Sequence, residues 1–304
     1  MTNSKRTART AAWAIAAGLI AWTASHRASA QLGIPSATAF ERGDVIVSLE
    51  PGPVLWYGPD GTPRRVIVGT EVGTGEGMAF DAAGNLYVTR WCIDGSCSTG
   101  NTVEKYTVNG LPAGRFGDGY DCNPHAIVFD RLGTAYVGLA GCSGAIVQLV
   151  PGGAAVSLPV APDNQGAFWI DLAPDGCTMF YTSWGPNVKR YDVCARTQLA
   201  DFNRAPLPGG AGQDLRVLSD GGVLVSSGEV VARLDASGTL AQTYHIPGEP
   251  SLWVGLDLVG DGTFWVGNYE SSNVYRFDLA TGAVRARFNT GTPGHTVVGI
   301  RVRK

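Results

Sequence analysis

A short sequence phrase recurs along the chain and limits the folds that it can adopt. An apolar strand is followed by a turn with Asp and Gly and then by a second apolar or aromatic strand, as in Gly77 to Val88 and Ala126 to Val137. Weaker copies begin at Trp169, Asp214 and Gly255. Equivalent apolar positions recur at intervals of 41 to 49 residues: Phe80, Phe129, Leu172, Val217, Leu258 and Val302. Such a period with four short strands per unit is typical of β-propeller blades.

The two ends of the repeat indicate how the ring closes. The segment from Asp44 to Val68 supplies three strands but lacks an innermost one, whereas Gly299 to Val302 resembles an inner strand without outer partners. We therefore expect an all-β, six-bladed β-propeller in which the C-terminal inner strand completes the N-terminal blade, since this closure leaves no exposed sheet edge. An open solenoid is the alternative, but it requires polar capping repeats that the sequence lacks.

The N-terminal residues indicate export. Three basic residues within the first nine are followed by an apolar run of 13 residues, Ala11 to Thr23, and then by Ala28-Ser29-Ala30, a pattern that signal peptidase accepts. We expect a cleaved signal peptide over residues 1–30 and a single propeller domain over residues 31–304. An uncleaved transmembrane anchor is the alternative, but a spanning helix needs about 20 apolar residues.

Charge and cysteine content narrow the partners and the compartment. Residues 1–30 hold four of the 23 Lys and Arg and no acid, so 19 basic against 26 acidic residues leave the rest of the chain at a net charge of −7. This sign argues against a nucleic-acid partner, whose phosphates require a basic face. All six cysteines follow residue 30, and an even number suits an oxidising compartment. We expect a monomer that is secreted or periplasmic.

The cysteine positions predict three disulfides. Cys177 and Cys194 lie symmetrically about the turn that contains Trp184, so antiparallel strands bring them together. Cys122 and Cys142 flank a hairpin in the same way, which leaves a small local loop between the remaining two cysteines, Cys92 and Cys97. A metal site is the alternative use of these sulfurs, but the spacing lacks the paired CxxC pattern of zinc sites.

Two segments resemble a known group of proteins. The run from Trp169 to Cys194 and the run from Gly77 to Thr89 resemble exported bacterial NHL-type propellers, over essentially the whole of residues 31–304. The chain is more distantly similar to gluconolactonase-like and virginiamycin B lyase-like propellers. That resemblance implies a ligand bound over the central channel, since the substrates of those enzymes lie there.

The same resemblance bears on a metal cofactor. Gluconolactonase-like enzymes hold a divalent cation, here calcium or zinc, with the Glu of a Glu-Gly pair that enters an inner strand, together with two Asn and an Asp from other blades. Glu76-Gly77 matches the first element. The other blades depart from the pattern, because their equivalent positions are His125, Phe168, Gln213, Val254 and Val298.

Polar and aromatic residues are expected to converge at one end of the channel. Strand entries and the loops after the second strands share that end of a propeller, and they carry Glu76, His125, Trp91, Trp169, Trp184, Gln213 and Asp214. The last five are predicted to bind a ligand. Glu76 and His125, on neighbouring blades, are predicted to serve as a catalytic acid and base, or as two metal ligands, if the protein is an enzyme.

A row of alternating charges follows deeper in the inner strands: Asp171, Arg216, Asp257 and Arg301. One interpretation is a charged channel floor that orients an anionic or zwitterionic ligand. The other, which we favour, is a network of ion pairs between blades that neutralises buried groups.

Two functions are consistent with these patterns. The favoured one is a propeller that binds a small molecule, carbohydrate or peptide at its channel mouth. The alternative is an enzyme, either a metal-assisted lactonase-like hydrolase or an elimination lyase, that uses Glu76 and His125.

Overall fold

The computed structural model describes residues 38–67, 73–95, 97 and 100–304. The predicted signal peptide, residues 1–30, lies outside the described residues. The chain divides into two units, Met1–Thr38 and Ala39–Lys304, and the fold below is that of the second. Within the described residues, no helix is long and apolar enough to cross a membrane.

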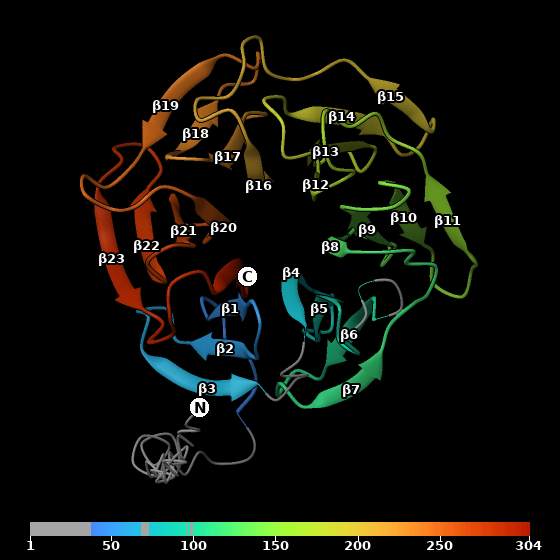
Figure 1. Ribbon diagram of the computed structural model, residues 1–304, viewed down its shortest axis with the longest axis horizontal. Helices are drawn as coiled ribbons and strands as arrows, with labels where there is room; N and C mark the ends of the chain where they lie inside the picture. Colours follow the sequence, from blue (N-terminus) through green and yellow to red (C-terminus); the bar gives the residue numbers. More distant parts are fainter. Residues whose placement is uncertain (1–37, 68–72, 96, 98–99) are drawn as a thin grey trace, which may run out of the picture. The chain divides into compact units, whose positions relative to one another are not determined.

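Within the described residues, the second unit forms a ring of six four-stranded antiparallel sheets, or blades (Figure 1). Blade 1 consists of β24 (Val297–Val302), β1 (Val45–Leu49), β2 (Val54–Tyr57) and β3 (Pro63–Ile67). Blade 2 consists of β4 (Thr74–Phe80), β5 (Leu86–Trp91), β6 (Thr102–Tyr106) and β7 (Pro112–Arg115). Blade 3 consists of β8 (Pro124–Phe129), β9 (Ala135–Leu139), β10 (Ile146–Leu149) and β11 (Ala155–Leu158).

The other half of the ring repeats this arrangement. Blade 4 consists of β12 (Trp169–Leu172), β13 (Thr178–Thr182), β14 (Lys189–Asp192) and β15 (Thr197–Leu199). Blade 5 consists of β16 (Gly212–Val217), β17 (Val223–Ser227), β18 (Val230–Leu234) and β19 (Leu240–Tyr244). Blade 6 consists of β20 (Trp253–Leu258), β21 (Thr263–Asn268), β22 (Asn273–Asp278) and β23 (Val284–Asn289).

The C-terminal strand closes the ring as predicted. Strand β24 pairs antiparallel with β1, with Val302 opposite Val45 and Ile300 opposite Val47. Figure 1 shows the C-terminus beside β1 at the centre of the ring. The first blade is therefore built from both ends of the unit, which removes two strand edges that would otherwise expose unpaired backbone groups.

Side-chain alternation in the inner strands packs each blade against its neighbours. One apolar row is at most 3% exposed in every blade: Met78, Ile127, Ile170, Leu215, Leu256 and Ile300. These residues face the preceding blade, as where Met78 packs with Ile46 and Trp56 of blade 1. Full burial of such a side chain stabilises the fold by about 1.5–3 kcal/mol.

The Asp and Gly of the repeated phrase form the first hairpin of a blade. In blade 3, Asp130 Oδ1 accepts hydrogen bonds from the backbone N–H groups of Leu132 and Thr134, each at 2.8 Å. Gly133 lies between them with a φ of 84°, a conformation that costs a side-chain-bearing residue strain. The carboxylate therefore accepts hydrogen bonds from backbone N–H groups that the tight turn leaves without a backbone partner.

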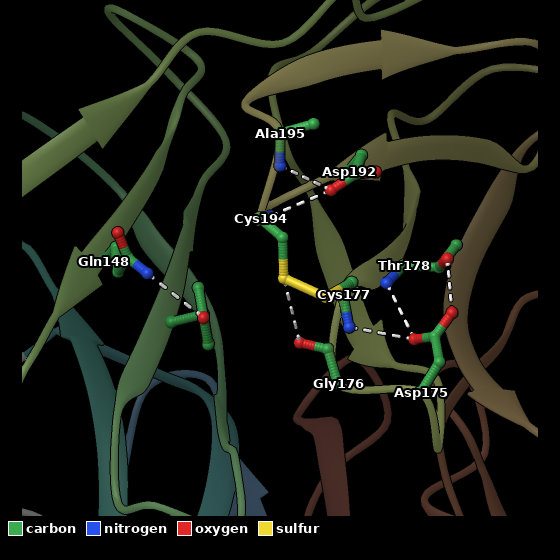
Figure 2. Close-up of a disulfide and its surroundings, with 9 residues drawn as sticks. Gln148, Asp175, Gly176, Cys177, Thr178, Asp192, Cys194 and Ala195 are labelled. Atoms are coloured by element: carbon green, nitrogen blue, oxygen red, sulfur yellow. Dashed lines mark hydrogen bonds between the residues drawn. A yellow bond between two sulfur atoms is a disulfide. The ribbon is translucent and has the colours of Figure 1, made fainter.

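The three predicted disulfides are all present: Cys92–Cys97, Cys122–Cys142 and Cys177–Cys194. Figure 2 shows Cys177–Cys194, flanked by Asp175 and Asp192, each of which accepts hydrogen bonds from the backbone N–H groups of a bridged cysteine and of the residue after it. Structural disulfides of this number are typical of oxidising compartments.

Candidate functional site

A cavity of about 360 Å³ lies where the inner strands begin, an end of the ring called the mouth below. Every residue that the sequence placed at the mouth borders it: Glu76, Trp91, His125, Trp169, Trp184, Gln213 and Asp214. Six further residues of its lining were not predicted from the sequence: Glu50, Asn123, Gln165, Leu252, Gly255 and Tyr269. Most of the lining is aromatic or aliphatic, with a few polar groups, which is typical of small-molecule sites.

β-bulges aim side chains into this cavity. In five of the six blades, the register between the innermost strand and its partner shifts where the strand enters the ring. In β8, for example, Pro124 lies opposite Leu139 and Ala126 lies opposite Gly138, so His125 is the extra residue. A bulge leaves such a residue outside the pairing and redirects its side chain. Glu76 and Gln213 lie in the corresponding shifts of β4 and β16.

The Glu76-Gly77 pair has a packing reason that is independent of any metal. A Cβ atom on Gly77 would lie 2.7 Å from the carbonyl oxygen of His125 and 2.7 Å from the Cα of Ala126, so only glycine fits beside the next inner strand. Among the described residues, no three His, Cys, Asp or Glu side chains come together as a metal site would require. The residues present therefore do not fit the calcium or zinc site that the gluconolactonase-like resemblance implied.

Glu76 and His125 meet at the mouth. Oε2 of Glu76 lies 3.3 Å from Nε2 of His125, and the two residues are only 5% and 6% exposed. Burial raises the pKa of Glu76 well above its usual range, and the charge of Glu50 raises it further, while Arg90 lowers it. Burial lowers the pKa of His125 to about 3. Near neutral pH the pair therefore consists of a neutral imidazole and a carboxyl group that tends to keep its proton.

Four buried polar atoms at the cavity have no hydrogen-bond partner. They are Trp91 Nε1, Asn123 Oδ1, His125 Nδ1 and Gln213 Nε2, out of nine such side-chain atoms in the described residues. Leaving a buried donor or acceptor unsatisfied costs about 1–3 kcal/mol. Their concentration in one cavity is what a site needs in order to hydrogen-bond a ligand.

Aromatic rings form a continuous wall beside these atoms. The ring of His125 packs on that of Phe168 with centroids 3.8 Å apart, and Phe168 in turn lies 5.3 Å from Trp184. Trp184 is 41% exposed and has a φ of 52°. Asn123 and Leu252, which also line the cavity, share this strained left-handed backbone, a feature that concentrates at functional sites.

Asp214 borders the cavity, but the protein itself occupies its carboxylate. Its Oδ1 accepts a hydrogen bond from Arg216 at 2.7 Å and its Oδ2 accepts one from the backbone N–H of Leu256 at 2.6 Å. The side chain is completely buried and reaches toward blade 6. That Asp214 contacts a ligand stays a prediction, because its side chain borders the cavity while both of its carboxylate oxygens accept hydrogen bonds within the protein.

The deeper charged row lies between blades. Arg216 Nε lies 2.9 Å from Asp257 Oδ1 on the next blade, and Arg301 Nε lies 3.6 Å from Asp257 Oδ2. Oδ2 of Asp171 accepts a hydrogen bond from the backbone N–H of Val217 at 2.8 Å, and the charge of Asp171 still acts on Arg216. This geometry is that of pairing between blades, to which Asp214 adds an ion pair with Arg216 within β16.

A recurrence in the sequence could have identified two of the missed residues. Glu50, Trp91, Trp184 and Tyr269 all occur at the end of the second strand of a blade or within two residues after it. The aromatic members of this set are visible in the sequence as a repeat. The position of Glu50 follows only once β1 is recognised as a second strand, which depends on the closure of the ring.

No family model matches the chain, and no curated protein matches it. Its fold is similar to a chain of a nidogen–laminin complex, with a TM-score of 0.69 and 14% identity over 84% of this chain and 97% of that chain. A protein of unknown function from Bacteroides caccae matches with a TM-score of 0.68 and 13% identity over 87% and 100%. Virginiamycin B lyase from Staphylococcus aureus matches with a TM-score of 0.55 and 14% identity over 73% and 71%.

Proposed function

We propose that this protein is an exported β-propeller that binds a small molecule, carbohydrate or peptide at its channel mouth. The observation that carries the proposal is the set of four unpartnered polar atoms in one aromatic-walled cavity. Export is supported by the predicted signal peptide and by the three disulfides. The sequence resemblance to exported NHL-type and gluconolactonase-like propellers supports the same assignment.

The cavity restricts the size and the chemistry of the ligand. Its volume of about 360 Å³ lies at the small end of the range of small-molecule sites. The N–H of Trp91 and the amide of Gln213 require acceptors, the carbonyl oxygen of Asn123 requires a donor, and the rings of Phe168 and Trp184 favour a flat or apolar face.

A binding screen of the exported protein tests the proposal. Native mass spectrometry against a library of sugars, small metabolites and short peptides should identify a ligand whose affinity falls about tenfold in Gln213→Leu, since a hydrogen bond is lost. The same variant should keep or increase its melting temperature, because Gln213 Nε2 has no partner within the protein. Gln148→Leu, on an outer strand, is the matched control. Ligands that bind to Gln213→Leu and to Trp184→Ala as tightly as to the unmodified protein would show that recognition occurs outside this cavity.

A lyase is the second candidate, and the Glu76–His125 contact favours it. A carboxyl group with a raised pKa can donate a proton near neutral pH or, once ionised, accept one from a carbon acid, and the neutral imidazole of His125 contacts that carboxyl group. The fold likeness to a virginiamycin B lyase is consistent with this use of the mouth. A metal-assisted hydrolase is less well supported, because Glu76 and His125 have no third ligating side chain among the described residues.

Turnover of a substrate would distinguish the lyase from a binding protein. Glu76→Gln and His125→Asn should each abolish turnover while substrate is still bound, if the pair transfers the proton. Retained turnover in both variants would exclude the pair as the catalytic groups.

A further inference from the structure

We propose that the mouth selects organic cations, with an ammonium group held by Glu50 and Glu76 among the aromatic rings. This inference rests on the proposed ligand-binding function and specifies its ligand class. It follows from the charge of the lining, from the rings around it and from the polar group opposite.

The charge of the lining is one-sided. In the described part of the chain, the lining includes Glu50, Glu76 and Asp214 but no Lys or Arg. The charge of Asp214 is matched by Arg216 at 2.7 Å, so it does not act on a ligand. Arg90, which lies near Glu76 from outside the lining, is itself paired with Glu104 at 2.9 Å. Glu50, together with Glu76 once Glu76 has lost its proton, therefore makes the mouth attractive to a cation and unfavourable to an anion.

Glu50 and Glu76 border the same cavity, and the charge of Glu50 acts on Glu76. Glu50 follows β1 in blade 1, and Glu76 lies in β4 of the neighbouring blade 2. Burial raises the pKa of Glu50, and both burial and the charge of Glu50 raise that of Glu76. A ligand cation would offset this repulsion, which no side chain of the lining does, and it would displace a proton from Glu76.

Aromatic rings surround the same space. Tyr269 borders the same cavity as Glu50 and Glu76, and its pKa is raised by burial and further by the charges of those two carboxyl groups. Trp91, Phe168 and Trp184 also border the cavity, and the rings of the last two lie 5.3 Å apart. A ring face attracts a desolvated ammonium group strongly enough to change affinity by about tenfold, and an alkylated ammonium gains most because it also buries methyl groups.

An independent feature indicates the other end of the ligand. Gln213 is 6% exposed, its Nε2 has no partner, and it lies in blade 5, which is opposite blade 2 in the ring. The amide N–H therefore meets an acceptor on the far side of the ligand from the cation. A hydroxyl or carbonyl oxygen a few bonds from the ammonium group satisfies both requirements.

Isothermal titration calorimetry with two matched probes tests the inference. Choline carries a quaternary ammonium and a hydroxyl, and 3,3-dimethylbutan-1-ol has the same shape without the charge. We expect choline to bind the exported protein at least about tenfold more tightly. Glu50→Gln and Glu76→Gln should each weaken choline binding by about tenfold more than they weaken binding of the neutral alcohol. Glu229→Gln removes an exposed acid outside the cavity and should have no effect.

The pH dependence gives a second readout. Choline affinity should rise with pH as Glu76 loses its proton, and Glu76→Gln should remove that rise. Equal binding of the two probes, or no choline binding up to about 10 mM, would overturn the inference. Binding of a neutral sugar that is weakened in Gln213→Leu would also overturn it but leave the proposed ligand-binding function in place.

Discussion

Removal of the Arg216 guanidinium should destabilise the ring strongly. Arg216 is 3% exposed, and it contacts Asp214 at 2.7 Å and Asp257 at 2.9 Å, both of which are fully buried. It joins blade 5 to blade 6, because Asp214 and Arg216 are in β16 and Asp257 is in β20. Arg216→Ala leaves two carboxylates in the interior without this shared cation.

The structure indicates which of the two carboxylates, Asp214 or Asp257, loses more stabilisation in Arg216→Ala. Asp257 keeps Arg301 at 3.6 Å, Lys304 at 3.4 Å and the backbone N–H of Val302, whereas Asp214 keeps only a backbone N–H. The stranded charge is therefore mainly that of Asp214. Breaking one side of a buried pair costs about 3–5 kcal/mol. For a unit of this size the melting temperature should fall by roughly 10 °C.

Thermal and urea unfolding of matched variants measure this loss. Arg233→Ala is the control, because Arg233 also lies 2.8 Å from a carboxylate, but that of Asp220 is 51% exposed, and such a pair contributes about 0–1 kcal/mol. Adding Asp214→Asn to Arg216→Ala should restore part of the stability, since the stranded group is then neutral. The reasoning fails if Arg216→Ala melts within about 2 °C of the unmodified protein.

Two further changes test the mouth and the opposite end of the ring. Burial lowers the pKa of His125 from its ordinary value of 6.5 to about 3, so His125 is protonated at a higher pH in the unfolded chain than in the folded one, and the free energy of unfolding falls as the pH drops from 6.5 toward 3. In urea unfolding at pH 7 and pH 5, His125→Asn should lose about 2 kcal/mol less stability over this interval than the unmodified protein. Equal losses would contradict the lowered pKa of His125. The Cys177–Cys194 bridge closes a loop of 17 residues, so replacing both cysteines by serine should lower the free energy of unfolding, measured in urea, by about 3 kcal/mol. A loss near zero would show that the hairpin is stable without the bridge.

The six-bladed fold could be predicted because the sequence patterns that determine it are local and repeat in each blade. The Asp-Gly turn, the strand alternation and the spacing of Phe80, Phe129 and their equivalents each depend on a few neighbouring residues. Closure by β24 followed from counting strands, and the disulfide pairs followed from symmetry about hairpin turns. The position of Glu76 and His125 at one height also followed, since both precede an inner strand in the same register.

The direction of individual side chains could not be predicted. Gln213 and Asp214 both border the mouth, but the carboxylate of Asp214, which lies in the bulge opposite Ser226, also accepts a hydrogen bond from the backbone of Leu256 in blade 6. A bulge depends on the register with a partner strand, and no local pattern records that register. For the same reason the sequence did not predict the ion pair of Arg216 with Asp214 in its own strand.

The bulges also explain how one backbone repeat produces an asymmetric site. The strand-entry position of each blade points into the same cavity, but its occupant changes around the ring: Val298, Glu76, His125, Phe168, Gln213 and Val254 in blades 1 to 6. The polar pair of blades 2 and 3 therefore lies across the channel from Gln213 in blade 5 and Val254 in blade 6. A ligand that satisfies this ring must have one polar or charged end, an opposite acceptor and apolar flanks between them. A uniformly polar or uniformly apolar molecule would leave either the rings or the buried hydrogen-bonding atoms without a partner.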